Sequence, residues 1–180
     1  MGLILLIAVF VFFGVALILL VLVGLRNTLV RERNELGKAW TNVDQLLKQR
    51  RDELPRLIGT CRSYLTAETG IFDYIAAARA AEQKAAPAEK ARAASDLTQA
   101  LHRLFAVADR NRDLSLDTSY RQLKKQLLIL EERINAEMER FREQAKAYNA
   151  RLGGLAGGIA GRTAGLRPQP TPTVPPNSQN

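Results

Sequence analysis

Side chains that commonly carry out catalysis or bind metals are scarce in this sequence of 180 residues. It contains one histidine, His102, and one cysteine, Cys61. A di-iron site in a helical bundle needs two Glu-x-x-His motifs and two further glutamates, but the residue three before His102 is Gln99. A serine nucleophile would also have to use His102, and the sequence lacks the glycine-rich elbow that exposes such a serine. We therefore predict no catalytic, metal-binding or cofactor-binding residue, no cofactor and no enzymatic activity.

Cys61 and Trp40 could react or bind a ligand, but both fall among apolar residues at helical spacing. A thiol on such a stripe is expected to be buried and inert, because burial disfavours the reactive thiolate. The indole of Trp40 is expected to anchor the core rather than to stack on a ligand. A single cysteine also excludes an intrachain disulfide.

The N-terminal stretch 2–25 contains only apolar residues and glycine. A helix rises about 1.5 Å per residue, so residues 3–25 extend over roughly 35 Å, enough to cross the ~30 Å hydrocarbon core of a membrane. A cleaved signal peptide is the alternative, but it has a basic start, a shorter apolar region and a small-residue cleavage site. Because these features are missing here, we predict a retained transmembrane helix.

The residues that follow this stretch predict its orientation. Arg26, Arg31, Arg33 and Lys38 all lie within fifteen residues of its end, whereas no basic side chain precedes it. The positive-inside rule then places the N-terminus outside and the rest of the chain in the cytoplasm. Arginines beside a membrane attract anionic lipid, by about 1 kcal/mol per charge near the surface. We expect Arg26, Arg31 and Arg33 to contact anionic lipid head groups.

The formal net charge of +8 is typical of proteins that bind nucleic acids or anionic membranes. Basic and acidic residues are mixed, however, in clusters such as Arg31-Glu32-Arg33 and Glu131-Glu132-Arg133. No predicted helix carries the continuous basic stripe of a nucleic-acid interface. We predict no nucleic-acid partner.

Between the apolar stretch and residue 152, apolar residues recur at the three- and four-residue spacings of amphipathic helices. The first stripe comprises Leu29, Leu36, Trp40, Val43, Leu47, Leu54, Ile58, Cys61 and Leu65. The last, in a heptad pattern typical of coiled coils, comprises Tyr120, Leu123, Leu127, Leu130, Ile134, Met138, Phe141, Ala145, Tyr148 and Leu152. Shorter stripes lie at 72–81 and 97–108. Helices with one apolar face must pack together, and short connections make neighbours antiparallel. The predicted fold is all-α, a single transmembrane helix followed by an antiparallel up-down-up-down four-helix bundle.

Breaks between these helices are marked by turn-forming residues. We predict a first turn at 66–70, a second at Ala86-Pro87 with a helix restarting at Ala88, and a third at 111–117. Asp113 and Asp117 are candidate N-caps in the third turn, since an aspartate oxygen accepts hydrogen bonds from the free amides of a helix start. Pro55 falls inside the first helix and should kink it.

Two arginines, Arg33 and Arg50, occupy positions on the first stripe where apolar residues are expected. If the first and last helices are antiparallel, the numbers of facing residues sum to about 180, which places Arg50 within reach of Glu131 and Arg33 near Glu143. Pairing with these carboxylates is one prediction. The alternatives are that both heads reach solvent at the surface, or that they contact a second protomer.

Residues 153–180 are rich in glycine and proline. Gly153, Gly157, Gly161 and Gly165 are spaced as in a membrane dimer motif, but that motif requires a long apolar span, and Arg162 interrupts this one. We predict a disordered, flexible C-terminal tail, with a weak interfacial contact as the minor alternative. The predicted boundaries are therefore an anchor at 1–25, a bundle at 26–152 and a tail at 153–180.

Residues of the first predicted helix, followed by residues between 104 and 149, occur in an order that resembles the LemA family. They are Leu29-Val30, Arg33-Asn34, Ala39-Trp40, Val43-Asp44, Leu47, Arg50, Asp52, Leu54-Pro55 and Leu57-Ile58, and later Leu104-Phe105-Ala106-Val107-Ala108, Asp113-Leu114, Leu123, Glu132-Arg133-Ile134 and Tyr148-Asn149. The resemblance spans roughly residues 20–150. It implies a bromodomain-like four-helix bundle on a single-pass anchor in the bacterial inner membrane. It implies no enzyme activity, since the family has no settled biochemical function, although some members are linked to building magnetosome membranes.

Two hypotheses for function follow. In the first, the protein is a non-enzymatic scaffold whose cytoplasmic bundle associates with protein partners or with further copies of itself. In the second, the bundle captures a lipid or small apolar ligand between its helices, or aids the biogenesis of a membrane organelle or the envelope.

Overall fold

A computed structural model of the chain describes residues 1–86 and 89–169. These residues form helices and no strand, which confirms the all-α class. The helices are α1 (Gly2–Arg62), α2 (Thr69–Lys84), α3 (Lys90–Ala108), α4 (Arg112–Leu116), α5 (Thr118–Gly153) and α6 (Leu155–Thr163). The helix restart expected at Ala88 and the proline-rich end from Pro170 lie outside the described residues.

The chain divides into two compact units, which we describe separately. Unit 1 comprises Met1–Lys38 and Glu143–Gln169, and the described part of unit 2 lies within Ala39–Arg142. Helices α1 and α5 contribute residues to both units, α6 belongs to unit 1, and α2, α3 and α4 belong to unit 2.

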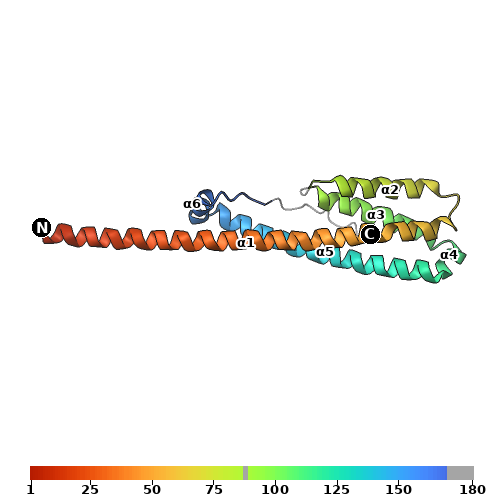
Figure 1. Cartoon of the computed structure of the whole chain (residues 1–180), viewed down its shortest axis with the longest axis horizontal. Helices are drawn as coiled ribbons and strands as arrows, with labels where there is room; N and C mark the ends of the chain where they lie inside the picture. Colours follow the sequence, from red (N-terminus) through yellow and green to blue (C-terminus); the bar gives the residue numbers. More distant parts are fainter. Residues whose placement is uncertain (87–88, 170–180) are drawn as a thin grey trace. The chain divides into compact units, whose positions relative to one another are not determined.

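Unit 2 has an apolar core to which five helices contribute. Figure 1 shows α2 beside α3, and side chains from α1, α4 and α5 complete the same cluster. Its fully buried members include Leu54, Leu57, Cys61, Ile75, Leu97, Leu104, Leu114 and Tyr120. All ten positions of the predicted α5 stripe are buried, as the heptad pattern requires.

The turn between α3 and α5 is held by two side-chain caps. The Asn111 side-chain oxygen accepts a hydrogen bond from the Leu114 amide at 3.0 Å and starts α4. The Asp117 carboxylate accepts one from the Tyr120 amide at 2.8 Å and starts α5. The cap predicted at Asp117 is confirmed. The one predicted at Asp113 is wrong, because α4 begins one residue earlier and places Asp113 in its first turn.

In unit 1, the first part of α1 exposes its apolar side chains. Leu3 is 74% exposed and Phe10 is 80% exposed. Helix α1 is long and apolar enough to cross a membrane, a test of length and composition that a signal sequence near the N-terminus also passes.

In unit 2, Pro55 lies inside α1, which continues past it to Arg62.

The expectation of a flexible tail is corrected for residues 155–169. Helix α6 ends at Thr163 and is followed by Gly165, whose φ of +63° is the left-handed conformation that glycine adopts without strain. The Leu166 amide donates to the Gly161 carbonyl and the Gly165 amide to the Arg162 carbonyl, the hydrogen bonds of a Schellman motif. The glycines that suggested flexibility thus end and pack a helix.

The chain after α6 returns to α5. The Tyr148 hydroxyl donates to the Arg167 carbonyl at 3.4 Å. The Asn149 side-chain amide donates to the Gln169 carbonyl at 2.8 Å and accepts from the Gln169 amide at 2.9 Å. Residues 153–169 therefore form a structured hairpin on the end of α5.

Candidate functional site

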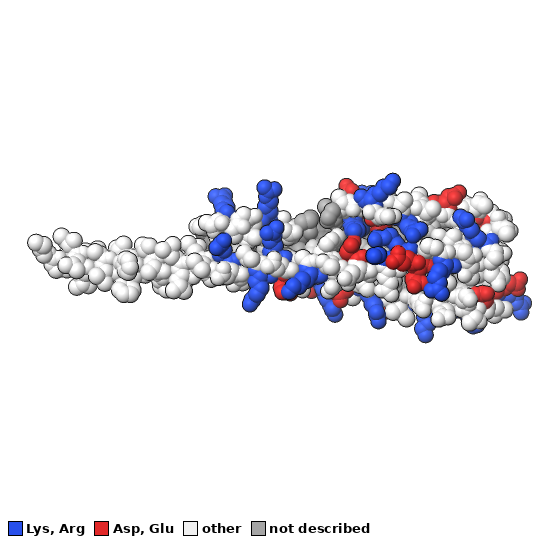
Figure 2. Space-filling view, viewed as in Figure 1, with Lys and Arg blue, Asp and Glu red and all other residues white. Residues whose placement is uncertain are grey.

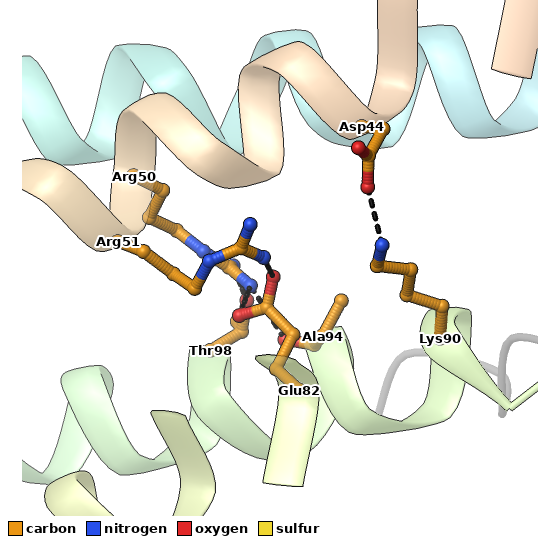
Figure 3. Close-up of polar contacts among 7 residues, drawn as sticks. All are labelled: Asp44, Arg50, Arg51, Glu82, Lys90, Ala94 and Thr98. Atoms are coloured by element: carbon orange, nitrogen blue, oxygen red, sulfur yellow. Dashed lines mark hydrogen bonds and ion pairs between the residues drawn. The ribbon is translucent and has the colours of Figure 1, made fainter. Parts of the chain in front are cut away.

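The most strongly buried polar group in unit 2 is an ion pair between α1 and α2. Arg50 and Glu82 have side chains exposed by only 1% and 0%. The Arg50 Nη2 atom donates to Glu82 Oε2 at 3.1 Å and to the Ala94 carbonyl of α3 at 3.2 Å. Its Nη1 atom donates to the Thr98 hydroxyl at 2.9 Å. One guanidinium thereby connects three helices (Figure 3).

A second arginine binds the other oxygen of the Glu82 carboxylate. Arg51 Nη1 donates to Glu82 Oε1 at 3.1 Å, so each carboxylate oxygen accepts from a different guanidinium. Lys90 at the start of α3 forms a further ion pair with Asp44 of α1 (Figure 3). Buried charges cost free energy unless they are paired and hydrogen-bonded in this way. The Arg50 network connects α1 to α2 and α3 inside the bundle, whereas the Asp44 side chain of the second pair is partly exposed.

The pairing predicted for Arg50 is therefore wrong in its partner. Glu131 lies 3.0 Å from His102 Nε2 instead, and Arg50 faces α2 and α3. The first helix does lie along α5 as predicted, but the Arg50 side chain points to α2 and α3 rather than to α5. Arg33 is exposed, so it is not a core residue.

In each unit, facing residues of α1 and α5 have numbers that sum to about 180, as predicted for antiparallel helices. In unit 2, the rings of Trp40 and Phe141 lie 5.2 Å apart, and their numbers sum close to 180. In unit 1, Glu32 forms an ion pair with Arg151. Trp40 is half-buried at the edge of a second apolar cluster rather than fully enclosed.

Glu82 and Thr98, which bind the Arg50 side chain, were not predicted as its partners. A signal for Glu82 was present, since it continues the stripe of Phe72, Ile75 and Ala78 at helical spacing. A carboxylate on one apolar stripe and an arginine on another indicate a buried pair. Nothing comparable marks Thr98, whose hydroxyl only adds to the network.

The Cys61 thiol, a group that could be reactive, is buried. Burial, with a smaller contribution from the nearby Asp117 charge, raises the pKa of the Cys61 thiol to about 12, so it stays protonated at neutral pH. Within the described residues, no three His, Cys, Asp or Glu side chains are grouped to hold a metal ion.

Unit 1 carries a marked excess of basic residues next to its apolar stretch. It contains eight Arg and Lys residues and three Glu residues. Two of those glutamates already pair, Glu32 with Arg151 and Glu35 with Lys38. In Figure 2, basic side chains gather where the uncharged start of α1 ends. Arg26, Arg31 and Arg33 are all exposed there.

Unit 2 has an open groove of about 520 Å³ between α1 and α5. It is lined by Asn42, Gln45, Leu46, Gln49, Arg133, Ala136, Glu137 and Arg140. Amides and charges of both signs face this open groove, a composition typical of the polar parts of protein interfaces.

A family model matches most of the chain. The LemA family model covers residues 39–180, which include all of unit 2 and the α6 hairpin. The chain belongs to the LemA family. This confirms the resemblance from Ala39 onward, whereas Leu29-Val30 and Arg33-Asn34 precede the matched range.

The LemA match covers the buried pair of Arg50 and Glu82, the groove and the α6 hairpin. No curated protein matches the chain. Function must therefore be argued from these features of the chain itself.

Proposed function

We propose that this LemA-family protein is a non-enzymatic scaffold, anchored in the bacterial inner membrane by a single helix, that presents a cytoplasmic bundle for protein association. The bundle is an up-down-up-down, bromodomain-like arrangement of α1, α2, α3 and α5. Short connections at 63–68, 85–89 and 109–117 support this interpretation, as does the core that the four helices share.

The exposed apolar start of α1 supports the anchor. Side chains such as Leu3 and Phe10 lie outside any core of unit 1, and an exposed apolar helix of this length is stable in lipid rather than in water. Arg26, Arg31 and Arg33 support an N-terminus outside the cell. A reporter fused after Asn180 should be active only if it functions in the cytoplasm. Periplasmic activity would contradict this orientation.

The groove between α1 and α5 is the observation on which we base the proposed protein association. The buried Arg50–Glu82 pair and the packed core hold the helices beside it in place, and preorganised surfaces bind with a smaller loss of conformational entropy. Six of the eight residues that line the groove are polar or charged, while most of the lining surface is apolar, and such a mixture is typical of protein interfaces.

A photo-crosslinking side chain in place of Gln45 tests this assignment in native membranes. We expect protein adducts of fixed size at Gln45, which lines the groove, and none when the same side chain replaces Gln99 on the exposed face of α3. Charge reversal by Arg133→Glu with Arg140→Glu should remove the adducts. Equal adducts at the two positions, or none at Gln45, would contradict association through the groove.

A binding module for a lipid or small apolar ligand is the second candidate. A cavity of about 210 Å³ in unit 1, lined in part by Leu36, Ala147 and Tyr148, favours it. Typical ligand pockets are larger, about 300–1,000 Å³. A lipid retained in fixed stoichiometry by washed protein, together with no adducts at Gln45, would favour this second function.

A further inference from the structure

Helix α6 is held on the end of α5 by its small residues. Gly157, Ala160 and Gly161 are buried, and a Cβ atom at Gly157 would lie 1.9 Å from the Arg151 carbonyl oxygen. That approach involves backbone on both sides, so no side chain can be accommodated at Gly157 without moving α6. The glycine spacing thus serves packing within one chain.

The opposite face of α6 combines an apolar and a basic side chain. Ile159 is 57% exposed, and Arg162, three residues later on the same face, is exposed as well. Arg167, just beyond the Schellman turn, is also exposed. An apolar side chain beside cations is the composition of helices that lie in the membrane interface.

Contacts within unit 1 place α6 at the level where the apolar part of α1 ends. Gly157 packs on Arg151, and Arg151 pairs with Glu32. Glu32 is seven residues after Leu25, or about 10 Å along the helix. Leu22 and Leu25 are half-buried, unlike residues 2–21, and Figure 1 shows α6 next to this part of α1. The head-group layer on each side of a bilayer is about 5–8 Å thick, so α6 lies at that layer or beside it.

We infer that the outward face of α6 is a second membrane contact, in which Ile159 enters the interface and Arg162 and Arg167, together with Arg26, Arg31 and Arg33, bind anionic phospholipid head groups. The excess of basic residues in unit 1 is complementary to such a surface. This inference rests on the proposed membrane anchor, because α1 sets the position of α6 relative to the bilayer. With this second contact, the C-terminal hairpin orients the protein at the membrane.

The test uses the full chain with Cys61→Ala and Thr163→Cys, labelled at the new cysteine with an environment-sensitive fluorophore. The protein is reconstituted in vesicles of phosphatidylcholine, with or without phosphatidylglycerol, that also contain a lipid bearing a head-group quencher. We expect quenching with phosphatidylglycerol and a clear loss of it without. Each of Arg162→Gln and Arg167→Gln should lower the ratio of lipid-contacting to water-exposed label about fivefold.

Three controls make the outcome decisive. Gly157→Ala, which displaces α6, should abolish quenching, whereas Gly158→Ala should preserve it because its Cβ would meet only ordinary contacts at 3.7 Å. Arg110→Gln in unit 2 removes one positive charge, as each of the two test variants does, and should change nothing. Quenching that is equal in both lipids, or absent from protein that resists alkaline extraction, would overturn the inference. Protein released by alkaline extraction would instead contradict the anchor itself.

Discussion

Unit 1 and unit 2 are both helical, but their apolar and charged residues are arranged in opposite ways. Unit 1 exposes a long apolar surface and has eight basic residues against three acidic ones. Unit 2 has a buried apolar core and nearly balanced charges, eighteen basic and fifteen acidic. This difference shows that unit 2 has an apolar core of its own, whereas the exposed apolar surface of unit 1 fits the lipid environment that we propose for it.

The largest expected effect is loss of the buried ion pair in unit 2. Glu82→Ala leaves the buried Arg50 charge without its carboxylate partner, which typically costs about 3–5 kcal/mol of stability. Thermal or urea unfolding of the full chain in detergent measures it. The control is Glu53→Ala, because Glu53 pairs with the exposed Arg56 and such pairs contribute about 0–1 kcal/mol. Similar losses for the two variants would show that the buried pair does not hold α1, α2 and α3 together.

Trp40→Ala should have the next largest effect. A fully buried Trp truncated to Ala costs about 3–5 kcal/mol, but Trp40 is half-buried against Phe141. We therefore expect a loss of about 2 kcal/mol, with a smaller loss for Trp40→Phe because an aromatic contact remains. The same unfolding curves measure both variants. No change on Trp40→Ala would show that its ring does not pack in unit 2.

A smaller effect is expected in unit 1, at Gly165. A left-handed conformation costs a residue with a Cβ atom about 1–2 kcal/mol, so Gly165→Ala should loosen the end of α6. Hydrogen exchange of the Leu166 amide, which donates to the Gly161 carbonyl, should become about tenfold faster. The control Gly153→Ala has no atom within 4 Å of the new Cβ and should leave that exchange rate unchanged. Equal rates in the two variants would argue against the Schellman turn.

The smallest effect concerns Asp109 in unit 2. Burial opposes its ionisation, but hydrogen bonds from Lys124 at 2.6 Å and Tyr120 at 3.0 Å, with the Lys124 charge, hold its pKa below the usual value. Its contribution is therefore present above the ordinary Asp pKa of about 3.9 and is lost as the pH falls through the lowered value.

Because Asp109 is partly exposed, Asp109→Asn should cost about 0–1 kcal/mol at pH 7. Urea unfolding of the variant and the parent at pH 7 and at low pH measures the difference, which should shrink on acidification. A difference that grows at low pH would contradict this assignment.

The sequence predicted the helices of unit 2 well because their apolar stripes have one clear period. All ten positions of the predicted α5 stripe are buried, as are Leu29, Leu36 and Val43 of the first stripe, whereas Trp40 is half-buried. The partner of Arg50 could not be predicted from α1 and α5 alone, because the rotation of a helix about its axis depends on all of its neighbours. The register of α1 against α5, by contrast, follows from the lengths of the helices and their antiparallel direction. The contact between the rings of Trp40 and Phe141 agrees with the predicted register.

The hairpin after α5 escaped prediction for a different physical reason. Glycine is the commonest residue of flexible linkers, but it also permits close helix packing, as at Gly157, and helix termination, as at Gly165. Composition cannot distinguish these roles. They depend on whether a neighbouring backbone lies within a few ångström, which only the folded chain reveals.

Mapping of lipid contacts along the chain tests the division between the two units most directly. The full chain is reconstituted with a phosphatidylglycerol analogue that carries a photoreactive head group, irradiated, digested and analysed by mass spectrometry. Our account predicts adducts on unit 1, at peptides containing Arg26, Arg31 or Arg162, and none on the α2 and α3 surfaces of unit 2. Adducts spread equally over both units, or confined to unit 2, would contradict it.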